Sequence, residues 1–264
     1  MTDKCISIRW LHGLSSQSDP FAHAREHGFS KIALSFPLAD SETFGIDYLS
    51  ATAKSIADLA NRYLMNVHAL IAHGRSIFDL ACGQPGSILA ESAISHLRFL
   101  LALAHALSDG IQDEKESDNS DSCDIPVILP AHSIVFPAGK ALPKDYCYEI
   151  AFNNLYQNLS GIVPYAEDKS NFLTIENPAS ALLTSPLELR ELIDEFNSAF
   201  IRVCFNPDNA SMIAHPKSCL GILTQRTTVL HLPLSAHQND IVGRSYRELL
   251  EISQKLCIPL VIYT

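Results

Sequence analysis

The 264-residue sequence lacks any apolar run of the roughly 18 residues that a membrane-spanning helix needs. Its longest candidate, 99–107, is short and is interrupted by His105. The first five residues are not followed by the apolar region of a signal peptide. We therefore expect no membrane partner and a cytoplasmic protein.

Paired cysteines are missing as well. The seven cysteines are scattered and odd in number, and none has the CxxC spacing of zinc knuckles or redox motifs. The sequence therefore predicts neither a disulfide framework nor a structural zinc site. Free thiols in apolar surroundings are expected instead.

Clusters of basic residues are also absent. The 19 Lys and Arg residues are spread along the chain against 29 Asp and Glu residues, which gives a net charge of −10. An acidic surface repels nucleic acid and anionic membranes, so neither is expected as a partner. One acidic, serine-rich stretch, 112–124, has almost no apolar residue and is predicted to be a mobile loop or insertion.

What the sequence does contain is an alternation of strand-like and helix-like segments. Eight apolar or β-branched segments are predicted strands: 5–11, 31–36, 66–72, 125–129, 171–176, 200–205, 227–232 and 258–262. Helical periodicity lies between them and is clearest over 87–107. Three helix starts are predicted from capping residues at Asp19, Ser185 and Ser245.

This alternation implies parallel β/α units. A hydrophobic content of 47% supplies a large core, and the length suits a closed barrel. We predict an α/β fold with residues 1–264 as a single (β/α)₈ TIM barrel of eight parallel strands, ending at strand eight. An open doubly wound sheet is the alternative, although no Gly-rich phosphate-binding turn follows the first strand.

Polar residues occur where several predicted strands end. Glu176 closes one strand before Asn177 and Pro178, and His73 ends another. Asn206 and His231 follow the same pattern on two later strands. Because the carboxyl ends of parallel barrel strands meet at one rim, we expect a polar site at this mouth.

Five short stretches, in this order and spacing, resemble the xylose isomerase-like TIM barrels. They are 73–81 (HGRSIFDLA), 174–177 (TIEN), 203–210 (VCFNPDNA), 230–232 (LHL) and 258–264 (IPLVIYT). The family includes sugar-phosphate isomerases and epimerases and the endonuclease IV enzymes. The resemblance covers nearly the whole chain. It implies a divalent metal at the mouth, held by Glu, Asp, His and Glu from strands five to eight.

The chain departs from this family pattern. Glu176 and His231 match the first and third implied ligands, but Asn206 and Tyr263 stand where the family has carboxylates. A family histidine is replaced by Asn209. The ligand set Glu176, Asn206 and His231 carries one negative charge instead of three, and Asp208 is an alternative to Asn206. We expect either one weakly held Mn²⁺, Co²⁺, Zn²⁺ or Mg²⁺ ion or no metal at all.

Glu176 and His231 are also the candidate catalytic residues, each as a metal ligand or as the general base and the electrophile. Imidazole, amide and guanidinium groups bind hydroxyl or phosphate oxygens. On this basis the candidate substrate contacts are His73, His132, Asn209, His237 and Arg244.

Three functions remain open. The leading hypothesis is an enzyme, an isomerase or epimerase of a small sugar or polyol with a weak or lost metal. The second is a binding or regulatory barrel, or one that runs a metal-independent reaction. An endonuclease IV-like phosphodiesterase is disfavoured because its clustered metals need more His and carboxylate ligands. A homodimer is expected because no closing helix follows the last predicted strand.

Overall fold

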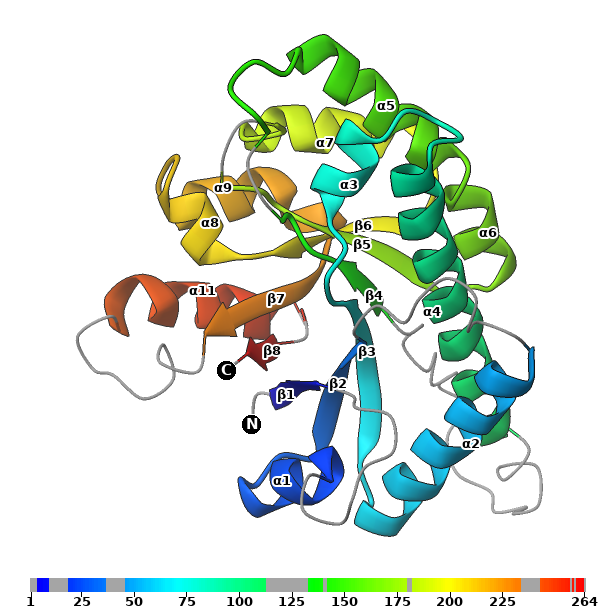
Figure 1. The fold of residues 1–264 in the computed structure, drawn as a ribbon. Coiled ribbons are helices and arrows are strands. Elements are labelled where there is room, and N and C mark those ends of the chain that lie inside the picture. The colour runs from blue at the N-terminus through cyan, green and yellow to red at the C-terminus, as the bar shows by residue number, and fades with distance from the viewer. Residues whose placement is uncertain are drawn as a thin grey trace.

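The computed structural model describes residues 4–9, 19–36, 46–112, 133–139, 142–179, 182–233, 243–256, 258 and 260–263 (Figure 1). The predicted strand 125–129, His132, His237 and residues 113–124 of the acidic stretch lie outside these ranges.

Parallel strands form the centre of the molecule. They are β1 (Lys4–Arg9), β2 (Lys31–Phe36), β3 (Asn66–Ala72), β4 (Ser133–Phe136), β5 (Phe172–Glu176), β6 (Ile201–Phe205), β7 (Thr227–Pro233) and β8 (Leu260–Tyr263). Each strand pairs in parallel with the next, and β1 also pairs with β8, so the order closes into a barrel. The predicted α/β TIM-barrel fold with parallel strands is confirmed.

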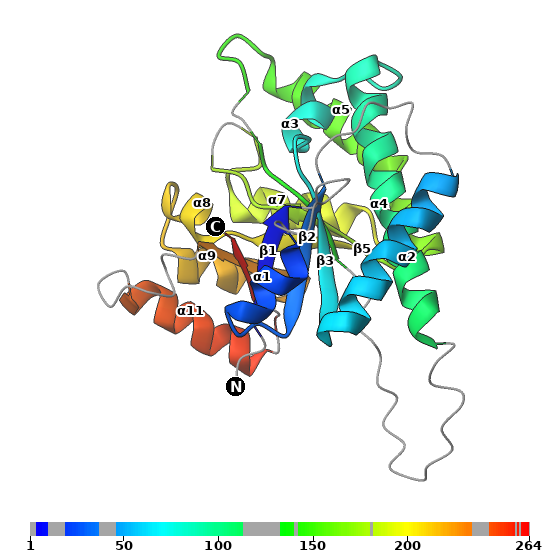
Figure 2. The same ribbon diagram turned by 60° about the horizontal axis from the view of Figure 1, so that its bottom comes forward.

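Helices lie outside the strands (Figures 1 and 2). They are α1 (Pro20–Glu26), α2 (Ile46–Tyr63), α3 (Ile77–Cys82), α4 (Ile88–Gln112), α5 (Tyr148–Ser160), α6 (Val163–Asp168), α7 (Pro186–Glu195), α8 (Pro207–Ser211), α9 (Pro216–Leu223), the 3₁₀ turn η1 (Thr224–Arg226) and α11 (Gly243–Lys255). Figure 2 shows α2 and α4 on one side of the central strands and α11 on another.

Helix α4 is apolar and long enough over Ile88–Ser108 to cross a membrane by length and composition, and in the described residues it alone meets that test. More than half of this window, 56%, is buried inside the protein. The helix packs against α2 and contacts β3 and β4. Its apolar surface therefore serves the core of the barrel.

Side-chain alternation along the strands divides the apolar core in two. Residues such as Ile32, Leu34 and Ile175 pack with the helices in the larger cluster. A second cluster contains only strand residues and therefore fills the barrel interior: Cys5, Ala33, Ala69, Ile71, Val135, Cys204, Val229 and Val261. Half of these side chains are Ala or Cys, whereas bulkier branched residues dominate most TIM-barrel interiors.

Capping residues explain where two of the helices begin. Asp19 accepts hydrogen bonds from the backbone N–H groups of Phe21 and Ala22 at 2.9 and 3.3 Å. Ser185 accepts one from Leu187 at 3.3 Å. Both predicted helix starts are confirmed. The predicted cap at Ser245 is wrong, because α11 begins at Gly243 and Ser245 lies within its first turn.

The fourth strand was predicted in the wrong place. The strand that pairs with β3 and β5 is Ser133–Phe136, not 125–129. Both segments are short and apolar, so hydrophobicity alone does not distinguish them. His132 therefore precedes β4, and the prediction that it follows the fourth strand is wrong. The segment that leaves β4 at the mouth is Pro137–Gly139.

Candidate functional site at the barrel mouth

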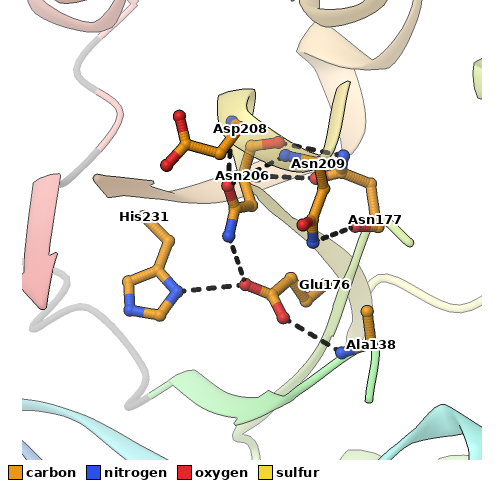
Figure 3. Close-up of polar contacts among 7 residues, drawn as sticks. All are labelled: Ala138, Glu176, Asn177, Asn206, Asp208, Asn209 and His231. Carbon is orange, nitrogen blue, oxygen red and sulfur yellow. Dashed lines mark hydrogen bonds and ion pairs between the residues drawn. The ribbon is translucent and has the colours of Figure 1, made fainter. Parts of the chain in front are cut away.

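The carboxylate of Glu176, the last residue of β5, is the centre of the site (Figure 3). Its Oε1 accepts hydrogen bonds from Nδ2 of Asn206 at 2.9 Å and from Nδ1 of His231 at 3.2 Å. Its Oε2 accepts one from the backbone N–H of Ala138 at 3.0 Å. The ends of β4, β5, β6 and β7 thus meet on one residue that is only 8% exposed.

Burial opposes ionisation of Glu176 and is the largest single influence on its pKa. The hydrogen bond and charge of His231, together with the hydrogen bonds from Asn206 and Ala138, outweigh burial, so the pKa lies below its ordinary value. Glu176 is therefore a carboxylate at neutral pH. Because an ionised carboxylate only accepts hydrogen bonds, Nδ1 of His231 carries a proton.

The orientation of the Asn206 amide is fixed from two sides. Its Oδ1 accepts hydrogen bonds from the backbone N–H groups of Asp208 and Asn209 at 3.0 and 3.3 Å, which caps α8. Turning the amide over would direct its NH₂ group at two N–H donors and its oxygen at a carboxylate. Nδ2 therefore faces Glu176.

A second set of amide contacts locks the end of β5 to the end of β6. The backbone N–H of Asn206 donates to Oδ1 of Asn177 at 2.6 Å, and Nδ2 of Asn177 donates to the carbonyl of Asn206 at 3.0 Å. Nδ2 of Asn209 donates to the carbonyl of Asn177 at 2.9 Å. Three asparagines thus connect the ends of β5 and β6 next to the site.

The segment after β4 is positioned by the turn after β3. The carbonyl of Pro137 accepts a hydrogen bond from the N–H of Ile77 at 2.9 Å. Gly139 has φ +75°, and a Cβ atom at this position would overlap Ser76. This close contact holds the Ala138 N–H where it reaches Glu176.

These donors do not fit a tightly held divalent ion. Within the described ranges, no group of three or more His, Cys, Asp or Glu side chains is placed to hold a metal. Both oxygens of Glu176 accept protein hydrogen bonds, and Asn206 presents an N–H rather than an oxygen. The Asp208 carboxylate points away from Glu176 in Figure 3.

The structure brings Glu176, Asn206 and His231 together, as expected from the strand ends. His73 is exposed in the turn after β3. Arg244 lies in the first turn of α11, and Tyr263 lies in β8 beside Ser7 and Pro233.

Sequence reasoning missed two contributors to the site. Ala138 contributes its backbone N–H, so its side-chain type gives no indication of this role. Because the fourth strand was predicted at 125–129, Ala138 was also not expected at the end of a strand. From the sequence, Asn177 was interpreted only as a residue that ends the strand before Pro178. The pattern that could have identified it as part of the site is an amide directly after the carboxylate that ends the strand.

A barrel of parallel strands with a polar cluster at their carboxyl ends defines the TIM-barrel class. The model of the xylose isomerase-like TIM barrel family matches residues 21–236, and the chain belongs to this family. A comparison with curated proteins finds no significant match.

Several solved structures share the fold at low sequence identity. D-psicose 3-epimerase with D-tagatose from Clostridium cellulolyticum H10 has a TM-score of 0.70 and 11% identity, over 99% of this chain and 84% of that one. The 3-keto-D-glucoside 4-epimerase YcjR from E. coli has a TM-score of 0.67 and 12% identity, over 100% and 92%. A probable 3-DHS dehydratase, AsbF, from Bacillus anthracis has a TM-score of 0.65 and 13% identity, over 100% and 92%.

Proposed function

We propose that the barrel mouth binds a small sugar or polyol and isomerises or epimerises it through Glu176 and His231, without a tightly held metal. The observation that carries this proposal is the partly buried carboxylate–imidazole pair, 3.2 Å apart, at the strand ends where TIM barrels place their active sites. Family membership and the sugar epimerases among the similar structures support a sugar ligand. A cytoplasmic location is part of the same proposal.

Isomerisation or epimerisation next to a carbonyl needs a proton to be taken from carbon and returned. Glu176 is a poor base for this step, because its pKa is low and three donors occupy its oxygens. Its role is to hold the Nδ1 proton of His231 and to stabilise a positively charged imidazole. Proton exchange with the ligand then falls to Nε2 of His231.

A non-catalytic binding barrel is the second candidate. It is favoured by the engagement of both Glu176 oxygens and by the asparagine contacts, which make the rim rigid. In this version the same mouth binds a polyol, and His231 donates a hydrogen bond without transferring a proton.

Binding and proton exchange separate the two candidates. Ketoses, aldoses and inositols are incubated with the protein in D₂O, and deuterium incorporation and ligand line broadening are followed by NMR. The variant His231→Asn keeps a donor near the Nδ1 position but removes Nε2, and His215→Asn, at an exposed position, is the control. Exchange that His231→Asn abolishes supports the enzyme. Binding without exchange favours the second candidate, and neither binding nor exchange overturns both.

The homodimer stays a prediction. Light scattering that gives the monomer mass of 29.0 kDa at every protein concentration would contradict it.

A further inference from the structure

Asn206 lies between a buried carboxylate and the start of a helix, and both ends of its amide have fixed partners. Nδ2 donates to Oε1 of Glu176, while Oδ1 caps α8 through two backbone N–H groups. Asn206 as a whole residue is 7% exposed. Rotation of the amide would break all three contacts at once, so the N–H stays on Glu176.

The charge of Glu176 is compensated within the protein. An isolated buried carboxylate is strongly disfavoured unless hydrogen bonds or opposite charge surround it. Here the N–H donors come from Asn206, His231 and Ala138. A cation that approached Oε1 would have to displace an N–H group that already donates to this oxygen.

We propose that the Asn206 amide takes the place of a bound cation at Glu176, so that the mouth has no affinity for a divalent ion until this amide is changed. The single substitution Asn206→Asp then creates a site for such an ion. The proposal rests on the proposed function only in treating the mouth as the ligand site, and its test needs no sugar.

The chemistry of the substitution follows from the contacts. An aspartate keeps one oxygen for the N–H groups of Asp208 and Asn209, since aspartate is a good helix cap. Its other oxygen replaces the N–H that faces Oε1 of Glu176 at 2.9 Å. Two carboxylates so close repel each other, and either a shared proton or a divalent cation relieves the repulsion. The imidazole of His231 is beside the same oxygen.

The test measures Mn²⁺ binding by equilibrium dialysis and electron paramagnetic resonance, and thermal melting in EDTA or Mn²⁺. For wild type we expect no stoichiometric Mn²⁺ and the same Tm in both solutions. For Asn206→Asp we expect one Mn²⁺ per chain, and a Tm that rises by several degrees when Mn²⁺ exceeds its Kd about 100-fold. Asp208→Asn is the matched control, because it removes a neighbouring carboxylate that points away from Glu176, and we expect it to behave like wild type.

Stoichiometric Mn²⁺ on the wild-type protein overturns the proposal, as does a folded Asn206→Asp protein with no response to Mn²⁺. If Asn206→Asp does not fold in EDTA, refolding in Mn²⁺ decides: recovery of the native circular dichroism supports the proposal, and no recovery overturns it. Failure of the sugar experiments leaves these outcomes unchanged. Sugar turnover by a wild-type protein that holds stoichiometric Mn²⁺ would overturn the present inference and the metal-free clause of the proposed function, while the sugar chemistry of the mouth would stand.

Discussion

Two carboxylates at opposite ends of the barrel are compensated in different ways. Glu176, at the carboxyl end of β5, has a side chain 10% exposed and accepts hydrogen bonds from one imidazole, one amide and one backbone N–H. Asp194, near the end of α7, has a side chain 45% exposed and pairs with Arg226 through contacts of 2.7 and 2.6 Å. Arg226 immediately precedes β7, so this pair lies at the amino ends of the strands.

Both carboxyl groups have a lowered pKa, but for different reasons. For Asp194 the main cause of the lower pKa is the hydrogen bond from Arg226; burial opposes it, and the charges of Arg226, Arg190 and Arg202 lower the pKa further. For Glu176 burial is the largest influence and is overcome only because several donors act together. Water can replace a lost partner of the half-exposed Asp194, whereas the Glu176 side chain has little contact with water. The comparison predicts that substitutions at the mouth lower the free energy of unfolding strongly. Substitutions at the amino ends of the strands, called the base below, should lower it only slightly.

The largest effect is expected for Glu176→Ala. The substitution leaves the Nδ1 proton of His231, the Asn206 amide and the Ala138 N–H without their acceptor in the interior. We expect a loss of about 3–5 kcal/mol in the free energy of unfolding, measured by urea denaturation. Asp194→Ala is the matched control and should lose no more than about 1 kcal/mol. Equal losses would contradict the contrast between the two ends.

The next effect concerns the segment that delivers Ala138. Gly139→Ala combines a positive φ with overlap against Ser76, so we expect a loss of about 2–4 kcal/mol. Gly86→Ala is the control, since Gly86 has φ +80° but nothing within 4 Å of the added Cβ, and it should lose about 1–2 kcal/mol. The difference between the two variants measures the contact alone. Identical losses would show that the contact carries no strain.

Asn206→Ala removes both the cap of α8 and a donor to Glu176. We expect a loss of about 2–3 kcal/mol by urea denaturation. Asn209→Ala, which removes one hydrogen bond to the carbonyl of Asn177, should lose about 1 kcal/mol. A smaller loss for Asn206→Ala than for Asn209→Ala would argue against the central place of Asn206.

The pH dependence of stability should follow Glu176. Its pKa is lower in the folded protein than the ordinary value of 4.5, so the unfolded chain binds its proton first as the pH falls. The stabilisation is complete above pH 4.5 and is lost as the pH drops towards the folded pKa. The difference in unfolding free energy between wild type and Glu176→Gln should therefore shrink below that pH. A constant difference at every pH would contradict the assignment.

The smallest effect is expected at the base. Arg226→Gln removes a pair that water and salt already screen, so the loss should be about 0.5 kcal/mol and should vanish in about 0.5 M NaCl. The losses at Glu176 and Asn206 should persist in the same salt, because their contacts are buried. A salt-sensitive loss at the mouth would remove the distinction between the two ends.

Much of the barrel could be predicted from the sequence because its strands are continuous apolar runs. The predicted ranges 31–36 and 66–72 coincide with β2 and β3. The fourth strand could not be chosen locally, because its identity depends on pairing with β3 and β5, and Ser133–Phe136 is only four residues long. The short helices α3 and α6 also lacked a periodic signal.

The residues of the site could be grouped from the sequence, but their contacts could not. Strand ends at one rim predicted that Glu176, Asn206 and His231 would meet. The direction of the Asn206 amide depends on two partners that the tertiary fold supplies, the start of α8 and the Glu176 carboxylate. A sequence shows that an amide replaces a carboxylate, and only the fold shows which of its atoms faces the centre.

The small side chains of the barrel interior include the thiol of Cys204, which is in register with Glu176. Burial, and then the charge of Glu176, raise the pKa of Cys204 well above its ordinary value, while Cys147 is exposed. Alkylating reagents should therefore modify Cys147 quickly and reach Cys204 only when β6 separates from its neighbours. Cys204 is thus a natural chemical probe of barrel opening, because its rate of alkylation reports how often β6 separates from its neighbours.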